Sequence, residues 1–113
     1  MNFDFKIELL IGDSKANKQS AMAETYRHVQ QGSIGFIGPS TSSSTIQVSR
    51  VLSVPSIDRA VIGYSATSAI LSDSAFSNFV RTVPSDDAPA KAMAKFITGV
   101  LASCLILFGH TMK

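Results

Sequence analysis

Hydroxyl side chains suited to binding an anion gather first behind the apolar stretch Ile34–Ile37. A Gly-Pro pair follows that stretch, then six consecutive hydroxyl residues run from Ser40 to Thr45. An apolar pattern at helical spacing begins directly behind them, so we expect a strand, a polar turn and a helix start in that order. The first helical turn offers unpaired backbone N–H groups and the positive end of the helix dipole. Hydroxyls placed there predict a small site for a carboxylate or a phosphate.

A second hydroxyl turn, residues 65–68, follows another apolar stretch, Ala60–Tyr64. In a parallel sheet every strand-to-helix turn opens on the same edge. The two hydroxyl turns are therefore expected to converge on one ligand. Taken alone, Ser and Thr at such turns most often cap helices, so this pattern identifies a candidate site and not a ligand.

Strands and helices are expected to alternate along the chain, which predicts an α/β fold with a parallel sheet flanked by helices. The expected strands are Phe5–Ile11, Ile34–Ile37, Ala60–Tyr64 and Phe79–Val83, and the expected helices are Lys18–Gln31, Thr45–Ser53 and a third beginning at Ser85-Asp86-Asp87. Helical spacing predicts three buried faces. These are Met22, Ala23, Tyr26 and Val29 in the first helix, Val48, Val51 and Leu52 in the second, and Ala90, Met93, Ala94 and Ile97 in the third.

Composition excludes several classes of protein. The 113 residues are 45% hydrophobic, enough for one compact domain. The net charge of +2 is spread along the chain without the basic, aromatic-rich patches of a nucleic-acid groove, so no nucleic-acid partner is expected. Cys104 is the single cysteine, which excludes an internal disulfide, and no residue cluster has metal-ligand spacing. No cofactor is predicted.

The two ends of the chain carry weaker signals. The first residues, MNFDFKIELLIGD, do not resemble a signal peptide, because Asp4 precedes any positive charge and the apolar run is short. The apolar run Phe96–Gly109 is shorter than the roughly 20 residues that cross a bilayer, so it is expected to be buried. Extending it back to Ala92 includes Lys95 and leaves a marginal membrane span as the alternative.

Three blocks of this sequence, taken together, carry a family resemblance. GFIGPSTSSSTIQV, VIGYSATSAILSD and FVRTVPSDDAPAKAMAKFI resemble lobe I of the extracellular ligand-binding domain of class C G-protein-coupled receptors, closest to the metabotropic glutamate receptors. The resemblance runs from about Phe5 to Ile97 and implies a partial lobe I of the type I periplasmic-binding-protein fold. Residues 1–97 are thus expected to form a partial receptor lobe, and residues 98–113 an apolar tail that does not match the family.

The resemblance also implies a ligand site. In the family, serines at the helix start after Gly-Pro hold the ligand's α-carboxylate, and these match Ser42 and Ser43, with Thr41 as an alternative register. The serine and threonine of YSATS, which touch the α-amino and α-carboxylate groups, match Ser65 and Thr67. The implied partner is an amino-acid-like small molecule. The implied location is the extracellular side of the cell membrane, where full-length family members dimerise.

The chain departs from the family pattern at both ends. Family members begin with a signal peptide and a strand-helix unit whose basic residues grip a ligand's distal acid, and neither is recognised here, so selectivity for glutamate is not predicted. They continue into lobe II, a cysteine-rich region and seven membrane spans, whereas this chain ends in TGVLASCLILFGHTMK. We therefore expect a receptor fragment that lacks lobe II and the transmembrane region and does not signal alone.

Three alternatives stay open on the residues alone. A periplasmic-type amino-acid-binding protein shares the fold. A flavodoxin-like FMN-binding domain also cradles phosphate at such turns, although the turn after Pro39 has no internal glycine. An enzyme with a serine nucleophile and His28 lacks a G-x-S-x-G elbow, so no catalytic residue is predicted. Several remaining side chains are interpreted as structural: His28 as a solvated helix residue, Tyr64 as a packing residue, Met22 and Met93 as core, Arg81 as a strand end and Asp86-Asp87 as a helix cap.

Overall fold

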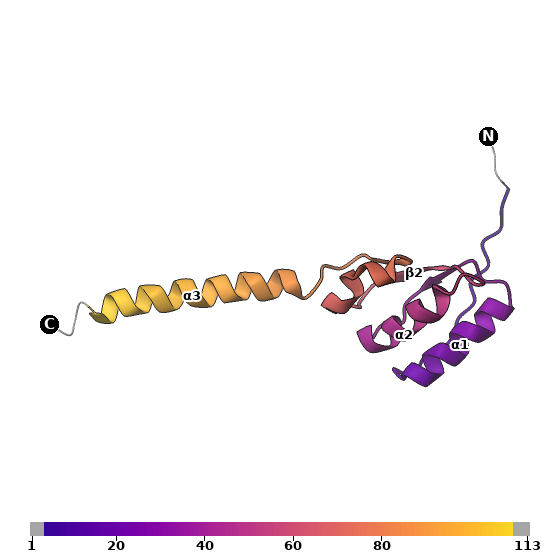
Figure 1. The fold of residues 1–113 in the computed structure, drawn as a ribbon, viewed down its shortest axis with the longest axis horizontal. Coiled ribbons are helices and arrows are strands. Elements are labelled where there is room, and N and C mark those ends of the chain that lie inside the picture. Colours follow the sequence, from indigo (N-terminus) through magenta and orange to yellow (C-terminus); the bar gives the residue numbers. More distant parts are fainter. Residues whose placement is uncertain (1–3, 110–113) are drawn as a thin grey trace.

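The computed structural model describes the backbone of residues 4–109 and the side chains of residues 4–104. Helices and strands alternate over most of this range (Figure 1). In chain order they are α1 (Lys18–Gln30), β1 (Gly35–Ile37), α2 (Ser42–Leu52), β2 (Ala60–Gly63), the short 3-10 helices η1 (Ala69–Ser72) and η2 (Ser74–Phe76), β3 (Phe79–Arg81) and α3 (Asp87–Gly109). The three helices and the last three of the four strands expected from the sequence are confirmed, with ends shifted by a few residues.

Within the described residues the strands form one parallel sheet in the order β1, β2, β3. Phe36 is level with Val61, and Val61 is level with Phe79. The predicted parallel α/β architecture is therefore confirmed. Because both crossovers return the chain to the same end of the sheet, the carboxyl ends of β1 and β2 lie side by side.

The core lies between one face of the sheet and the helices α1 and α2. Its centre consists of Ala21, Val48, Leu52 and Val61, with Val29, Phe36, Ile57 and Phe79 packed around it. Val48 and Leu52 are 1% and 0% exposed, so the predicted inner face of α2 is confirmed. The opposite face of the sheet carries the alternate residues Ile37, Ile62 and Val80, and these are exposed because no described helix covers them.

The predicted inner face of α1 is confirmed for Val29, which packs against the core, and is otherwise shifted by about one position. Ala21, Thr25 and His28 are buried, whereas Met22 and Tyr26 are 37% and 56% exposed. The small Ala21 packs with side chains of α2 in the core, so α1 can lie close to α2. A larger Met or Tyr side chain at this contact would increase the distance between the two helices. His28 is therefore a buried residue, and Met22 is not part of the core.

The predicted strand Phe5–Ile11 is also wrong. Residues 4–14 have no strand pairing, and Phe5, Ile7, Leu9 and Ile11 are at least 73% exposed. A groove of about 730 Å³, lined by residues 7–10 on one side and β1 on the other, lies between this segment and the sheet. A strand needs a neighbour about 4.8 Å away to form its ladder, and across this groove the alternating pattern of the segment meets none.

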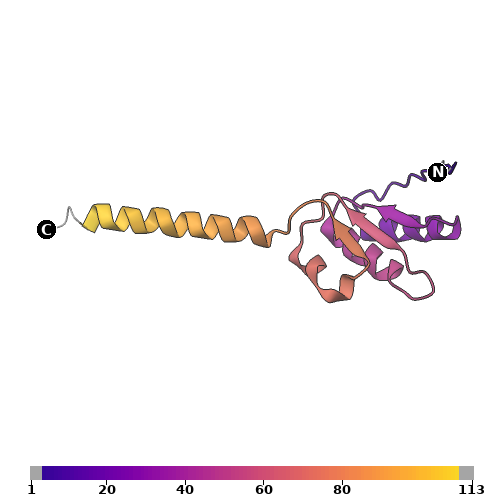
Figure 2. The same cartoon turned by 90° about the horizontal axis from the view of Figure 1, so that it is seen from above.

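Helix α3 leaves the sheet and extends away from it as one continuous helix (Figures 1 and 2). Its described side chains, through Cys104, are all exposed, including Met93 and Ile97 at 63% and 49%. The predicted inner face of this helix and the predicted burial of the apolar run from Phe96 are therefore wrong for the side chains described. An apolar stripe identifies the face that a helix can bury. In α3 no described element packs against that face, so it stays exposed.

Two expectations about α3 concern its place in the molecule. Across residues 4–109, none of the helices meets the length and apolarity that a membrane crossing requires. The helix passes without interruption through the predicted boundary between residues 97 and 98, so that division stays a prediction from the sequence.

Candidate functional site

The first hydroxyl turn connects the end of β1 to the start of α2. Gly38 turns the chain with φ +92°, a conformation that favours glycine, and a Cβ at this position would lie 3.3 Å from the Cε1 atom of Tyr64. Thr41 occupies the cap position of α2, but its side chain does not cap the backbone. Its Oγ1 donates instead to Oγ of Ser44 at 2.9 Å.

Half of the six hydroxyl residues stabilise this turn from within. Ser44 and Thr45 are 0% exposed. Oγ1 of Thr45 lies 3.0 Å from the carbonyl oxygen of Pro39 and 2.9 Å from that of Thr41, so one hydroxyl ties the turn to the helix it precedes. The Thr41 hydroxyl is also engaged, because it donates to the buried Ser44.

The two hydroxyl turns meet. Oγ of Ser42, which is half-buried, accepts a hydrogen bond from the backbone N–H of Ser68 at 3.2 Å. Ser43, the next residue on α2, is exposed. The expectation that the two turns lie together at one edge of the sheet is confirmed by this contact.

The second hydroxyl turn is anchored by a buried alanine that lies between two residues with hydroxyl side chains. Ala66 is 0% exposed and packs with Leu71 and Phe76 in a small apolar cluster. Its neighbours on either side, Ser65 and Thr67, are exposed and half-buried. All four residues predicted as a ligand site, namely Ser42, Ser43, Ser65 and Thr67, therefore lie on two joined turns at the carboxyl ends of β1 and β2.

At the rim formed by the two hydroxyl turns, the start of α2 favours an anion, whereas Asp86 lies next to the second turn, where its N–H donates to the Thr67 carbonyl oxygen. No acidic residue lies in the first turn of α2, nor anywhere in residues 38–45 or 64–68. The positive end of the α2 dipole is therefore not opposed by a carboxylate within either turn. The first-turn N–H groups and the hydroxyls of Ser42 and Ser43 can donate to a carboxylate or phosphate, and hydroxyl oxygens of the second turn can accept from an ammonium group.

Two polar residues that the sequence did not single out for this region hold it in place. Arg81, at the end of β3, donates from Nη1 to the carbonyl oxygen of Ser68 at 3.0 Å. Asn78, just before β3, bonds through its side chain to Ser49 and Arg59. For Arg81 the sequence offered one indication, an arginine at the end of a predicted strand. No sequence pattern pointed to Asn78.

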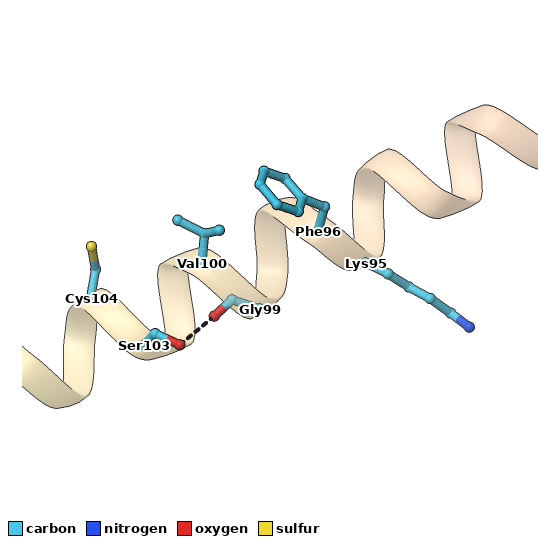
Figure 3. A pocket seen from close by; sticks show the side chains of 6 residues that line it. All are labelled: Lys95, Phe96, Gly99, Val100, Ser103 and Cys104. Carbon is cyan, nitrogen blue, oxygen red and sulfur yellow. Dashed lines mark hydrogen bonds between the residues drawn. The ribbon is translucent and has the colours of Figure 1, made fainter.

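Neither of two hollows on the described surface is lined by the predicted site residues Ser42, Ser43, Ser65 and Thr67. The groove beside β1 reaches Ser40 and Tyr64 at one end, but its walls are residues 7–16, α1 and β1. Tyr64, interpreted from the sequence as a packing residue with a solvated hydroxyl, is 52% exposed, and its ring edge lies against Gly38. A hollow of about 370 Å³ lies on the bare surface of α3 among Phe96, Gly99, Val100, Ser103, Cys104 and Lys95, where Ser103 Oγ donates to the Gly99 carbonyl at 2.9 Å (Figure 3).

The arrangement offers no catalytic constellation among the described residues. His28 lies on α1 with Nε2 3.0 Å from Arg27 Nη2 and 4.0 Å from Glu24 Oε2, on the groove side of the molecule and not in the hydroxyl turns. Groups of His, Cys, Asp or Glu able to hold a metal ion are not found in the part of the chain that the structure describes.

Comparison with known proteins agrees with the fold. Residues 1–100 match the family model described as the receptor family ligand binding region, which is not an enzyme family. The chain is 42% identical over 65 residues to G-protein coupled receptor family C group 6 member A of Carassius auratus, a match that covers 57% of this chain and 7% of that protein. The resemblance to the ligand-binding region of class C receptors is thereby confirmed. The chain belongs to the receptor family ligand binding region.

Proposed function

We propose that this chain forms part of the amino-acid-binding cleft of a class C receptor, on the extracellular side of the cell membrane. The α-carboxylate of the ligand binds to first-turn N–H groups of α2 and to the hydroxyls of Ser42 and Ser43. The α-amino group binds to the hydroxyl turn that contains Ser65 and Thr67. Side chains of the ligand point away from this rim, so the proposal covers the head group that amino acids share.

The observation that carries this proposal is the 3.2 Å hydrogen bond from Ser68 N–H to Ser42 Oγ. It brings donors on α2 within reach of acceptors on the second turn, and an amino acid head group, with its anion and cation on one carbon, needs both at short range. A phosphate ligand would use the first turn but has no positive group to place at the second.

The proposed affinity of this chain alone is weak. In the receptor family as the sequence resemblance describes it, a second lobe closes on the ligand, and a ligand on one lobe stays exposed to water on its open side. We expect a Kd of about 1 mM or weaker, equivalent to about −4 kcal/mol. Signalling and dimerisation belong to the whole receptor, and we propose that this chain performs neither alone.

A titration of the ¹⁵N-labelled full chain by NMR tests the proposal. The probe is L-alanine, with alaninamide and propionate as matched compounds that lack the carboxylate or the amine. We expect L-alanine to shift the amides of Ser43 and Thr67, and each matched compound to bind at least several-fold more weakly. Equal binding of all three compounds, or shifts confined to α1 or α3, would contradict the proposal.

Two exposed serines, one at the start of α2 and one just after its end, supply the matched variants. Ser43→Ala removes an exposed hydroxyl at the start of α2, and Ser53→Ala removes an exposed hydroxyl just after its end, where it donates to the Arg50 carbonyl. We expect Ser43→Ala to weaken L-alanine binding about threefold to tenfold, and Ser53→Ala to leave it unchanged. A parallel titration with FMN tests the flavodoxin alternative, which tighter binding of FMN than of L-alanine would favour.

A further inference from the structure

We propose that Arg81 is a positioning residue for the rim, because it fixes the second hydroxyl turn against α2 and adds an unneutralised positive charge beside it. The part of this inference that concerns ligand affinity rests on the proposed function. The part that concerns the turn itself is independent of any ligand.

Arg81 holds η1 to β3 through two hydrogen bonds from its guanidinium. Its guanidinium donates from Nη1 to the Ser68 carbonyl at 3.0 Å and from Nη2 to Oγ of Ser72, so it joins both ends of η1 to β3. The residue is half-buried at the end of β3. A planar guanidinium can hold two oxygens in fixed directions, whereas a lysine ammonium on a flexible stem cannot.

Ser68 is held from both sides. Its carbonyl accepts from Arg81, and its N–H donates to Ser42 Oγ at 3.2 Å. A hydrogen bond from a charged donor is stronger than a neutral one, and it polarises the groups bonded further along. Thr67, one residue earlier, is fixed in turn by its carbonyl, which accepts from Asp86 N–H at 2.9 Å. The position of the predicted ligand residue Thr67 therefore depends on Arg81 and on the start of α3.

The charge of Arg81 is not cancelled by an ion pair among the described side chains. The ion pairs found there join Glu24 to Arg27 and to His28, on α1. Arg81 bonds instead to a carbonyl and a hydroxyl, which leave its net charge in place. A full positive charge therefore lies next to Ser68, the residue that bonds to Ser42 at the start of α2, and it attracts an anionic group.

Two variants and one control separate positioning from charge. Arg81→Met removes the planar guanidinium and its charge but keeps an unbranched apolar side chain. Arg81→Lys keeps the positive charge but loses the two donor nitrogens held in one plane. Arg27→Met is the matched control, since it removes one positive charge from an exposed arginine on α1, away from the rim.

The first measurement needs no ligand and compares amide hydrogen exchange in the folded full chain. We expect Arg81→Met to speed exchange of the Ser68 amide at least tenfold relative to wild type. Arg81→Lys should restore less than half of the lost protection of the Ser68 amide, on a logarithmic scale. Arg27→Met should leave the exchange rate of the Ser68 amide unchanged. Unchanged Ser68 exchange in Arg81→Met, or full recovery with lysine, would overturn the positioning role.

The second measurement titrates the same variants with L-alanine. We expect Arg81→Met to weaken binding about tenfold and Arg81→Lys to weaken it about threefold, with no change in Arg27→Met. If wild type binds no L-alanine, the proposed function fails while the exchange result still decides the role of Arg81. If wild type binds and Arg81→Met binds equally well, the inference fails while the proposed function stands.

A measurement on the unaltered chain covers the case in which Arg81→Met does not fold. The guanidinium ¹⁵N and ¹H resonances of Arg81 should be resolved and slow to exchange at low temperature, because its two Nη atoms donate to Ser68 and Ser72. Averaged, rapidly exchanging guanidinium resonances for Arg81 would overturn the positioning role.

Discussion

Asn78 joins three elements of the fold, and its replacement by alanine tests how the site is supported. Its Nδ2 donates to the carbonyl oxygens of Ser49 on α2 and Arg59 before β2, at 3.0 and 3.1 Å. Its Oδ1 accepts from Oγ of Ser49 at 2.7 Å. One amide side chain therefore ties the middle of α2 to the starts of β2 and β3.

The size of the effect follows from these three hydrogen bonds. Each contributes about 1 kcal/mol net, and a buried hydroxyl left without a partner costs about 1 to 3 kcal/mol. Ser49 is 0% exposed, so its hydroxyl would be in that position. Asn78→Ala should lower the free energy of unfolding by about 4 to 6 kcal/mol, a large fraction of the 5 to 15 kcal/mol typical of a domain.

Urea unfolding followed by circular dichroism at 222 nm measures this change. Ser77→Ala, at the exposed neighbouring position, is the control and should change stability by less than about 0.5 kcal/mol. Ser49→Ala removes the hydroxyl that Asn78 satisfies, so the double variant should be more stable than the sum of the two single changes predicts. The coupling energy expected for directly bonded side chains is about 0.5 to 3 kcal/mol.

Two results would refute this account of Asn78. A loss below about 1 kcal/mol for Asn78→Ala would show that the three hydrogen bonds are not maintained in solution. Strict additivity with Ser49→Ala would show that the two side chains do not depend on each other. Asn78→Asp keeps the shape but turns an oxygen toward two carbonyl oxygens, so it should destabilise at least as much at neutral pH.

Two further predictions concern burial and charge. Leu52→Ala should lower the free energy of unfolding by about 2 to 5 kcal/mol, because Leu52 is 0% exposed. Ile97→Ala on α3, at a residue that is 49% exposed, should lower it by less than about 0.5 kcal/mol. Equal losses of stability in thermal melts would show that α3 packs on the sheet. The hydrogen bond from Arg27 lowers the pKa of Glu24 below its ordinary value of 4.5, so its small contribution to stability is present above that pH and lost as pH falls through the lowered pKa. Arg27→Met should return the pKa of Glu24 toward 4.5 in an NMR titration of its carboxyl carbon, and an unchanged value would contradict the pairing.

The sequence predicted the rim well because the rim is built from local signals. A Gly-Pro pair after an apolar stretch, hydroxyls before a helical pattern and a repeat of that order one strand later each describe only a few neighbouring residues. Parallel topology then follows from the alternation of elements. The contact between Ser42 and Ser68 needed no further information than the neighbouring positions of β1 and β2.

The failures share a different cause, since each depends on what a segment meets in space. Phe5–Ile11 alternates like a strand, but a groove and not a strand lies beside it. Met22 and Tyr26 have core-like spacing, but α1 packs on α2 through Ala21. Met93 and Ile97 lie on a stripe that meets no described surface. A pattern in the chain gives the period of an element, while its burial is decided by partners that the pattern does not contain.

Under the proposed function, the same distinction explains why this chain would supply only one side of a binding site. Everything that orients the two hydroxyl turns lies within the described residues: the Ala66 cluster below, Arg81 beside and Ser42 across. What would shield a ligand from water is an opposing surface, and none of the described elements reaches over the rim. Orientation without enclosure gives head-group selectivity at low affinity. Tight binding therefore has to come from a surface outside these residues, so discrimination among amino acid head groups should be measurable in this chain even where occupancy at micromolar ligand is negligible.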